Sequence, residues 1–304
     1  MAFLHSHTPP KDNQTAIIQQ CVKLIRMYVI WTIIYLPGFI STYSKCDHPI
    51  KSAMVGFITG KSYSHLWYLS AAAVALLLTL AAYKAFKSWN IVLMLAFLLY
   101  IIGLSYDSYY GIFRSLEIWN VPGIYKIAKN ALSVIQTTRD GVFFGFFFVS
   151  AGAVIAKKQE KTQKTFCKKG VIFSFAFGVV EVAAVHLANW QRREDAVDMY
   201  LYLIPVSIFL FCWLLKCNNV KSISNSNIRK ESTFIYLIHI WVRTIWLRLC
   251  IPVLGKIPAN NIYSFCENAL IVFLVDAGAS ILLAKIYVRV SRTKYGKWLR
   301  KWIA

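Results

Sequence analysis

The sequence predicts an all-α polytopic membrane protein: a transmembrane helical bundle of about eight spans with both termini in the cytoplasm. Of its 304 residues, 58% are hydrophobic and the mean hydropathy is +0.52. A soluble domain of this length does not need so much apolar surface. The apolar residues also gather in runs long enough for the ~30 Å hydrocarbon layer of a bilayer. Lysine and arginine fall mainly in the segments between those runs.

No low-complexity linker separates the apolar runs, so we expect one membrane domain over residues 21–304, preceded by a polar segment over 1–20. That polar segment lacks the continuous apolar stretch and the small-residue cleavage site of a signal peptide. The predicted spans are 22–41, 66–83, 91–106, 141–156, 171–188, 200–215, 233–253 and 266–288.

The distribution of basic residues predicts the orientation of these spans. With the N-terminus inside, 22 of the 34 lysines and arginines fall on the cytoplasmic side and 10 fall outside. The remaining two, Arg243 and Arg248, lie within a span. Because cytoplasmic loops carry the excess of Lys and Arg, this bias places both termini inside.

The net charge of +21 and the seven cysteines mainly serve to exclude classes of partner and site. No stretch alternates basic residues with stacking aromatics, so anionic lipid headgroups are the expected partner and nucleic acid is not. The cysteines are odd in number and include no CxxC pair, which argues against a disulfide framework and against a metal site. We expect them to be small buried apolar residues.

The longest outside loop, residues 107–140, is rich in aromatics and has helical apolar spacing. These features predict a helix that lies on the membrane surface or folds back into it. A loop of more than thirty residues is also long enough to be functional.

Ionisable residues inside spans are the first places to look for function, because each costs at least ~2.5 kcal/mol at the bilayer centre. Those in this sequence are Glu181, Arg243, Arg248 and Asp276. Two interpretations stay open for the acidic pair: a functional site, or neutralisation by one of the two arginines.

His65 has a similar ambiguity, because it opens the segment YSHLWYLSAAAVALLL (63–78). It is either part of a site or part of an interfacial aromatic belt with Trp67 and Tyr68. His186 and His239 also lie within predicted spans. For both, a functional role and a purely structural one stay open, because position in the span does not decide between them.

Motifs of soluble enzymes, such as a nucleophile elbow, a Walker loop or HExxH, are absent from the sequence. Four stretches in order nevertheless resemble the acyltransferase family 3 membrane domain, including the membrane half of vancomycin-resistance serine racemases. They are CVKLIRMYVIWTIIYLP (21–37), YSHLWYLSAAAVALLL (63–78), TTRDGVFFGFFFVSAGAVI (137–155) and IRKESTFIYLIHIWV (228–242). The resemblance covers nearly the whole chain from about residue 21.

The resemblance implies a membrane O-acyltransferase in the plasma membrane of a bacterium. Such a protein takes an acyl group, usually acetyl, from cytoplasmic acyl-CoA and moves it to a polar cell-surface acceptor such as a glycan. No permanently bound cofactor is implied. The alternative, from the racemase branch, is transport of serine or another small polar solute. The absence of an obvious internal repeat favours the enzyme over the transporter.

The family's motifs are carried over residue by residue. Its basic RxxR motif falls on Lys23 and Arg26, where two cations one helical turn apart are expected to bind the phosphates of acyl-CoA. Its HLW-type histidine falls on His65, and its Arg-Asp-Gly segment begins at Arg139. These two residues, with Glu181 as the acidic residue inside a span, are the candidate catalytic residues.

The front of the chain departs from the family pattern. Family members begin with two further spans, and the first of these carries the histidine thought to be the central base. Here MAFLHSHTPP leads almost directly to the third family span, and His5 and His7 do not match that histidine. The chain alone is therefore expected to lack part of the acyl-transfer machinery.

Overall fold

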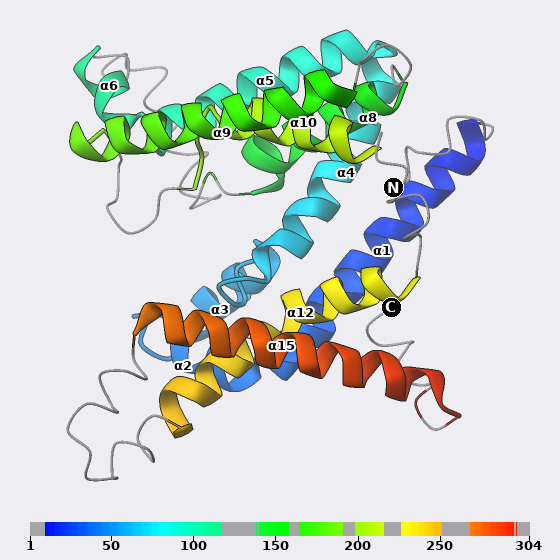
Figure 1. Cartoon of the computed structure of the whole chain (residues 1–304), viewed down its shortest axis with the longest axis vertical. Helices are drawn as coiled ribbons and strands as arrows, with labels where there is room; N and C mark the ends of the chain where they lie inside the picture. Colours follow the sequence, from blue (N-terminus) through cyan, green and yellow to red (C-terminus); the bar gives the residue numbers. More distant parts are fainter. Residues whose placement is uncertain are drawn as a thin grey trace. The chain divides into compact units, whose positions relative to one another are not determined.

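The computed structural model describes residues 10–116, 138, 140–157, 164–190, 198–215, 226–250, 268–294 and 296. Every regular element in these ranges is helical, which confirms the all-α class. The chain divides into two compact units, Met1–Val220 and Lys221–Ala304 (Figure 1).

The first unit contains most of the helices. They are α1 (Pro10–Ile34), α2 (Leu36–Tyr43), α3 (Pro49–Ile58), α4 (Trp67–Phe86), α5 (Trp89–Tyr106), α6 (Tyr110–Ser115), the π-helix η2 (Gly141–Gly145), α8 (Phe146–Lys157), α9 (Lys164–Leu187) and α10 (Leu203–Leu215). The second unit contains α12 (Ser226–Ile245), the π-helix η3 (Trp246–Cys250) and α15 (Ala269–Arg292).

Among the described residues, five helices are long and apolar enough to cross a membrane, which agrees with a multi-pass membrane protein. They are Gln14–Ile34, Trp67–Phe86, Trp89–Tyr106, Thr165–Leu187 and Ala269–Arg292. Two further predicted spans correspond to the shorter apolar helices Gly141–Lys157 and Leu203–Leu215. The span predicted at 233–253 falls on α12 and η3, and its last three residues lie outside the described residues.

The first helix is displaced from its prediction. The sequence placed a span at 22–41, but α1 runs from Pro10 to Ile34 and α2 then begins with Pro37 in its first turn. Proline lacks an N–H and its ring collides with the preceding turn, so a helix tends to end just before it. The predicted boundary at residue 20 therefore falls inside α1, and Lys23 and Arg26 lie within the apolar segment Gln14–Ile34.

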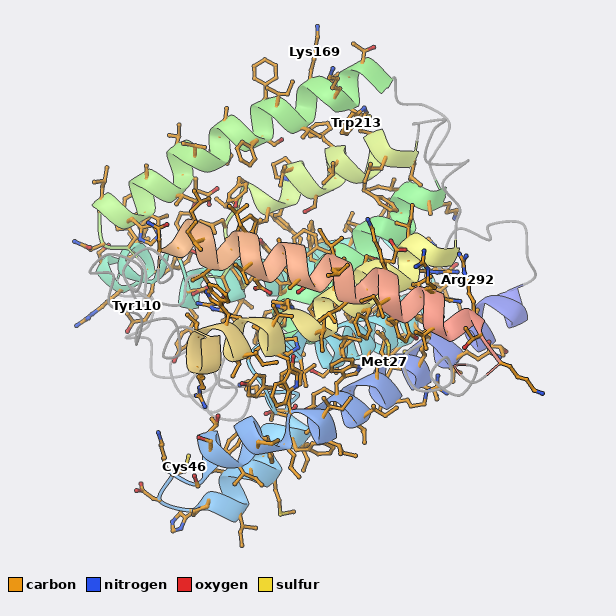
Figure 2. All side chains as sticks on the ribbon, turned by 60° about the horizontal axis from the view of Figure 1, so that its bottom comes forward. Met27, Cys46, Tyr110, Lys169, Trp213 and Arg292 are labelled. Atoms are coloured by element: carbon orange, nitrogen blue, oxygen red, sulfur yellow. The ribbon has the colours of Figure 1, made fainter. Side chains whose placement is uncertain are left out.

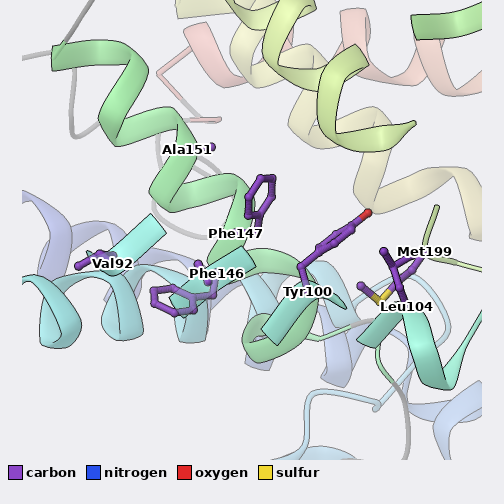
Figure 3. Close-up of a cluster of buried hydrophobic side chains, with 8 residues drawn as sticks. Val92, Tyr100, Leu104, Phe146, Phe147, Ala151 and Met199 are labelled. Atoms are coloured by element: carbon purple, nitrogen blue, oxygen red, sulfur yellow. The ribbon is translucent and has the colours of Figure 1, made fainter. Parts of the chain in front are cut away.

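The core of the first unit lies where α5 and α8 pack together (Figure 3). Its centre is Tyr100, which is fully buried and surrounded by Phe147, Phe148 and Phe144 with ring centroids 5.3 to 6.2 Å away. The Tyr100 hydroxyl donates a hydrogen bond to the carbonyl oxygen of Tyr200 (2.7 Å). The core thus holds the segment before α10 against the end of α5.

The outer face of α9 is apolar and exposed, as a lipid-facing helix requires. Its exposed side chains include Phe173 (73%), Phe175 (64%) and Val180 (67%). Lys169, near the start of the same helix, points away from the bundle (Figure 2). The helix packs its other side on α10, beside which it lies (Figure 1).

In the second unit, α12 and α15 pack against each other in opposite directions (Figure 1). Phe234 stacks on Tyr287 with ring centroids 4.5 Å apart. Asp276 accepts a hydrogen bond from Ser280 one turn later (3.3 Å). Within the described part of this unit, no ion pair joins Asp276 to an arginine, so Ser280 rather than Arg243 is its partner there.

Candidate active site at the start of α4 and η2

His65 lies at the entrance to α4 and is only 7% exposed. Two tyrosine rings enclose the imidazole edge-on: Tyr35 at a centroid distance of 4.9 Å and Tyr63 at 5.9 Å. A belt residue keeps its side chain exposed, as Tyr68 does with 53% exposure. His65, buried between two aromatic rings, therefore lacks the exposure that Tyr68 has and that a belt residue needs.

The turn that carries His65 is fixed against α1. Ser62, 1% exposed, shares a hydrogen bond with Thr32 (2.7 Å between hydroxyl oxygens). Its backbone N–H donates to the Tyr28 hydroxyl (3.3 Å), which in turn donates to the Phe57 carbonyl (2.8 Å). Buried hydroxyls in mutual contact leave little freedom in this turn.

Gly60 allows the chain to enter this turn. Its φ of +79° is left-handed, and a Cβ at this position would collide with the Ser70 hydroxyl on α4. Only glycine adopts that conformation without strain. The close approach brings residues 60–65 onto the first turns of α4.

Lys61 is half-buried in the same turn. Its N–H donates to the Gly56 carbonyl (2.6 Å), and its carbonyl accepts from the Tyr43 hydroxyl (2.8 Å). Burial lowers the pKa of Lys61 to about 8, an effect that the negative charge of Asp140 partly opposes.

Asp140 caps the π-helix η2. Its Oδ1 accepts hydrogen bonds from the N–H groups of Val142 (2.9 Å) and Phe143 (2.8 Å). Burial raises the pKa of Asp140 to about 6, while these two bonds and the charge of Lys61 act in the opposite direction. Both backbone bonds use the same oxygen, Oδ1.

Glycines hold the start of η2 against α4. A Cβ on Gly141 would lie 2.6 Å from the Ala71 carbonyl oxygen, and one on Gly145 would lie 2.9 Å from Cβ of Ala75. The pairing of small residues allows two helix backbones to approach closely. This crossing brings the Asp140 segment to the end of α4 that carries Lys61 and His65.

Arg139, the predicted partner of His65, lies outside the described residues, although Thr138 and Asp140 on either side are described. Its role stays a prediction. The surface helix predicted within 107–140 is described only for its first part, where α6 forms a short helix. The rest of that loop, apart from Thr138 and Asp140, lies outside the described residues.

Glu181 belongs to a second polar cluster, at the end of α9. It is 5% exposed, and its carboxylate accepts three hydrogen bonds from the Tyr109 hydroxyl (2.6 Å) and the N–H groups of Leu201 (2.6 Å) and Tyr202 (2.7 Å). Three neutral hydrogen-bond donors therefore stabilise the Glu181 carboxylate, a role that one interpretation of the sequence gave to Arg243 or Arg248. The carboxylate fixes the backbone that leads into α10.

Asp107 fixes the same segment from the other side. Its Oδ2 accepts from the N–H groups of Asp198 (3.0 Å) and Met199 (2.8 Å). Met199 in turn lies beside Phe143, because a Cβ on Gly103 would be within 3.0 Å of both side chains. The Asp107 carboxylate thus fixes Met199, whose side chain packs near Gly103 and Phe143 close to the end of α5.

Lys23 and Arg26 are three residues apart on α1, which confirms that they lie one helical turn from each other. Lys23 is partly exposed and Arg26 exposed. Their neighbours Leu24 and Met27 are buried (7% and 3%). The two cations are therefore on an accessible part of the helix.

The sequence singled out His65 but missed Lys61 and gave Asp140 no role of its own. The available signal was GKSYSHLW, in which a glycine, a lysine and a histidine fall within six residues of a predicted outside loop. Only the fold brings the Gly60–Lys61 turn and the segment after Asp140 onto the first turns of α4, where Gly60 meets Ser70 and Gly141 meets Ala71.

A bundle of apolar helices with partly buried titratable groups at the helix ends defines a multi-pass membrane protein with a polar site. The sequence model of the acyltransferase domain family matches residues 2–284, and the chain belongs to this family. The family expected from the four sequence stretches is thereby confirmed.

Relatives with curated names are amino-acid racemases of enterococci. The chain is 26% identical over 222 residues to a serine/alanine racemase of Enterococcus gallinarum, covering 71% of this chain and 30% of that protein. It is 25% identical over 268 residues to an amino-acid racemase of Enterococcus faecalis, covering 87% and 35% respectively. The chain thus spans about a third of the length of these relatives. No solved structure gives a significant match.

Proposed function

We propose that this protein is a membrane O-acyltransferase of the bacterial plasma membrane. It takes an acyl group, acetyl being the expected one, from cytoplasmic acyl-CoA. It transfers this group to a hydroxyl of a polar surface acceptor such as a glycan. Membership of the acyltransferase domain family supports the reaction class.

The observation that carries the proposal is the burial of His65 at the mouth of α4, beside the turn that holds Lys61. An imidazole enclosed by Tyr35 and Tyr63 has a fixed orientation, which a general base needs. In this proposal His65 removes the proton of the acceptor hydroxyl. Arg139 orients the acceptor or the acyl carbonyl.

Lys23 and Arg26 are the proposed ligands for the phosphates of acyl-CoA. Two cations one turn apart on α1 match adjacent phosphates, and Arg26 can bind one of them through two N–H groups. Glu181 acts here as a positioning residue, since three hydrogen bonds already engage its carboxylate.

The experiment is acyl transfer in liposomes, with labelled acetyl-CoA and a panel of soluble glycans, by the protein with the two leading spans of the family pattern supplied, because this chain alone is expected to lack part of the machinery. His65→Gln keeps polarity and size but takes up no proton near neutral pH, so transfer is expected to fall by about 100-fold or more. Arg139→Lys is expected to lose most transfer as well. The matched control is His48→Gln, because His48 is an exposed loop residue. Full activity of His65→Gln would contradict the catalytic role and support the alternative that His65 is part of an interfacial aromatic belt.

A second candidate function is transport of serine or another small polar solute. The observation that favours it is the similarity to proteins named as amino-acid racemases. Uptake of labelled serine by liposomes that contain the protein tests this candidate. Serine uptake without any acyl transfer would replace the enzyme proposal.

A further inference from the structure

A short helical hairpin, α2 and α3, follows the first span. The helix before it is apolar over the 21 residues Gln14–Ile34, which at 1.5 Å per residue extend about 31 Å and already cross the ~30 Å hydrocarbon layer. The helix α2 has 8 residues and α3 has 10, so neither is long enough to cross that layer again. The hairpin therefore begins where the membrane-spanning part of α1 ends.

One side of α3 is nevertheless apolar and exposed. Ile50, Met54 and Ile58 are 79%, 60% and 77% exposed. Their spacing of four residues places them on one side of the helix. The opposite side packs on α2, because a Cβ on Gly56 would collide with the phenol ring of Tyr43. Ile50, Met54 and Ile58 thus form an apolar stripe, the α3 stripe, which the described part of the chain leaves uncovered.

The exposed apolar side of the first span continues onto the hairpin. Val29 and Ile33 are exposed near the end of α1. Leu36 and Ile40 are exposed on α2, after intervals of three and four residues that keep to one helix face across the bend at Pro37. The bilayer that faces α1 is therefore the surface next to the hairpin.

Basic side chains accompany the α3 stripe. Residues 44–48, which connect α2 and α3, are all polar or charged, and only Asp47 among them is acidic. Cys46 lies at the tip of this connection (Figure 2). Lys45 and Lys51 are exposed, one in the connection and one in the first turn of α3. Lysines beside an apolar stripe match anionic headgroups above lipid acyl chains.

The hairpin is also fixed to the turn that leads to His65. The Tyr28 hydroxyl on α1 donates a hydrogen bond to the Phe57 carbonyl on α3 (2.8 Å), and the two rings lie 5.5 Å apart between centroids. The Tyr43 hydroxyl on α2 donates to the Lys61 carbonyl (2.8 Å). The depth of α3 in the membrane therefore sets the depth of this turn.

We propose that α2 and α3 form an interfacial hairpin whose partner is the phospholipid bilayer, with the α3 stripe inserted among the acyl chains at the membrane surface. Lys45 and Lys51 lie at the level of the anionic headgroups. The hairpin neither spans the bilayer nor projects into water, and it holds the turn before His65 at the membrane surface. This inference does not depend on acyl transfer, because it concerns only the lipid around the two helices.

The experiment measures probe depth for the protein in liposomes of phosphatidylcholine with about one quarter phosphatidylglycerol. A fluorescent label is placed on single cysteines in an otherwise cysteine-free chain: Met54→Cys on the α3 stripe, Leu77→Cys on an exposed position in the middle of α4, and the native Cys46. Iodide on both sides of the bilayer should quench the label at 46 by about 3-fold more than the label at 54. A nitroxide near the headgroup end of the lipid chain should quench the label at 54 most, and a nitroxide at the chain end should quench the label at 77 most.

A second arm tests the role of the lysines. Phosphatidylglycerol that carries the nitroxide near its headgroup should quench the label at 54 by about 2-fold more than phosphatidylcholine with the same nitroxide. Lys45→Gln combined with Lys51→Gln should remove this difference. The matched control is Lys84→Gln combined with Lys87→Gln, two exposed lysines at the other end of α4, which should leave the difference unchanged.

Three results would overturn the inference. Iodide quenching at 54 as strong as at 46 would place α3 in water. Quenching at 54 by the chain-end nitroxide as strong as at 77 would place α3 in the bilayer interior. Protection of the label at 54 from iodide and from both nitroxides would mean that a second copy or another protein covers the α3 stripe.

The unmodified protein decides the question if the cysteine-free chain does not fold. A phospholipid with a photoreactive group near its headgroup should label residues 49–58, and one with the group at its chain end should label the middle of α4 instead. Labelling of α4 by the second lipid without labelling of residues 49–58 by the first would contradict the inference.

Discussion

Replacing Glu181 tests how the end of α9 holds the segment before α10. Glu181→Ala removes the acceptor of three hydrogen bonds, from Tyr109, Leu201 and Tyr202. The two backbone N–H groups then lose their acceptor at a buried position, since Glu181 is only 5% exposed. Each unpaired buried donor costs about 1–3 kcal/mol, so we expect a loss of about 3–5 kcal/mol in the free energy of unfolding.

Glu181→Gln gives a smaller and informative effect. The remaining oxygen can keep the bonds to Tyr109 and Leu201, whereas the new NH₂ group faces the N–H of Tyr202. One mismatched donor pair predicts a loss of about 1–3 kcal/mol. Because Glu181 positions backbone and does no chemistry in our proposal, the folded fraction of this variant should retain acyl transfer.

A double-mutant cycle with Tyr109→Phe isolates the shortest of these bonds. A coupling energy of about 1–2 kcal/mol is expected for a hydroxyl bonded to a carboxylate. The assay is equilibrium unfolding in mixed detergent, followed by tryptophan fluorescence, with Tyr110→Phe as the control. Two results would refute the reasoning: a stable Glu181→Ala variant, or a Glu181→Gln variant that folds normally and has lost all transfer.

Three further predictions follow from the site and the topology. Gly141→Ala should lower both stability and transfer, because its Cβ would lie 2.6 Å from the Ala71 carbonyl oxygen; thermal unfolding and the acetyl assay measure these, with Gly152→Ala, which meets no atom within 4 Å, as the control. The free energy of unfolding should fall as pH rises from about 4 to about 6, because the pKa of Asp140 is about 6 in the folded state against its usual 3.8, so the folded state keeps the proton in this range. Asp140→Asn should remove this dependence of stability on pH, as pH-dependent unfolding would measure. Cysteine probes in a cysteine-free background should react from outside at position 120 and not at position 163; labelling of 163 in intact cells would reverse the orientation predicted from the 22 to 10 bias of basic residues.

The sequence by itself determined the class of the protein and most of its helices. Runs of apolar residues predicted spans at 66–83 and 91–106, and the structure has helices over Trp67–Phe86 and Trp89–Tyr106. The reason is that a bilayer requires long apolar segments with their backbone bonded internally, a demand visible in composition alone. Four short stretches were also enough to indicate the family.

Only the tertiary structure decided which polar residues meet. Glu181 and the arginines Arg243 and Arg248 are all costly in a membrane, so charge alone favoured pairing them. The fold instead gave Glu181 three neutral donors from Tyr109 and the segment before α10. Which donors reach a buried carboxylate depends on where loops return to the bundle, and spacing along the chain does not contain that information.

The same holds for the surroundings of Lys61. In the sequence Lys61 is one of three basic residues in a predicted outside loop, and nothing there relates it to Asp140, 79 positions later. The close crossing of η2 on α4 at Gly141 brings the segment of Asp140 onto the same first turns of α4 that Gly60 meets at Ser70, because small residues let the backbones approach. The sequence thus determined the helices and the chemistry of the side chains, whereas helix packing decided which of those side chains share a site.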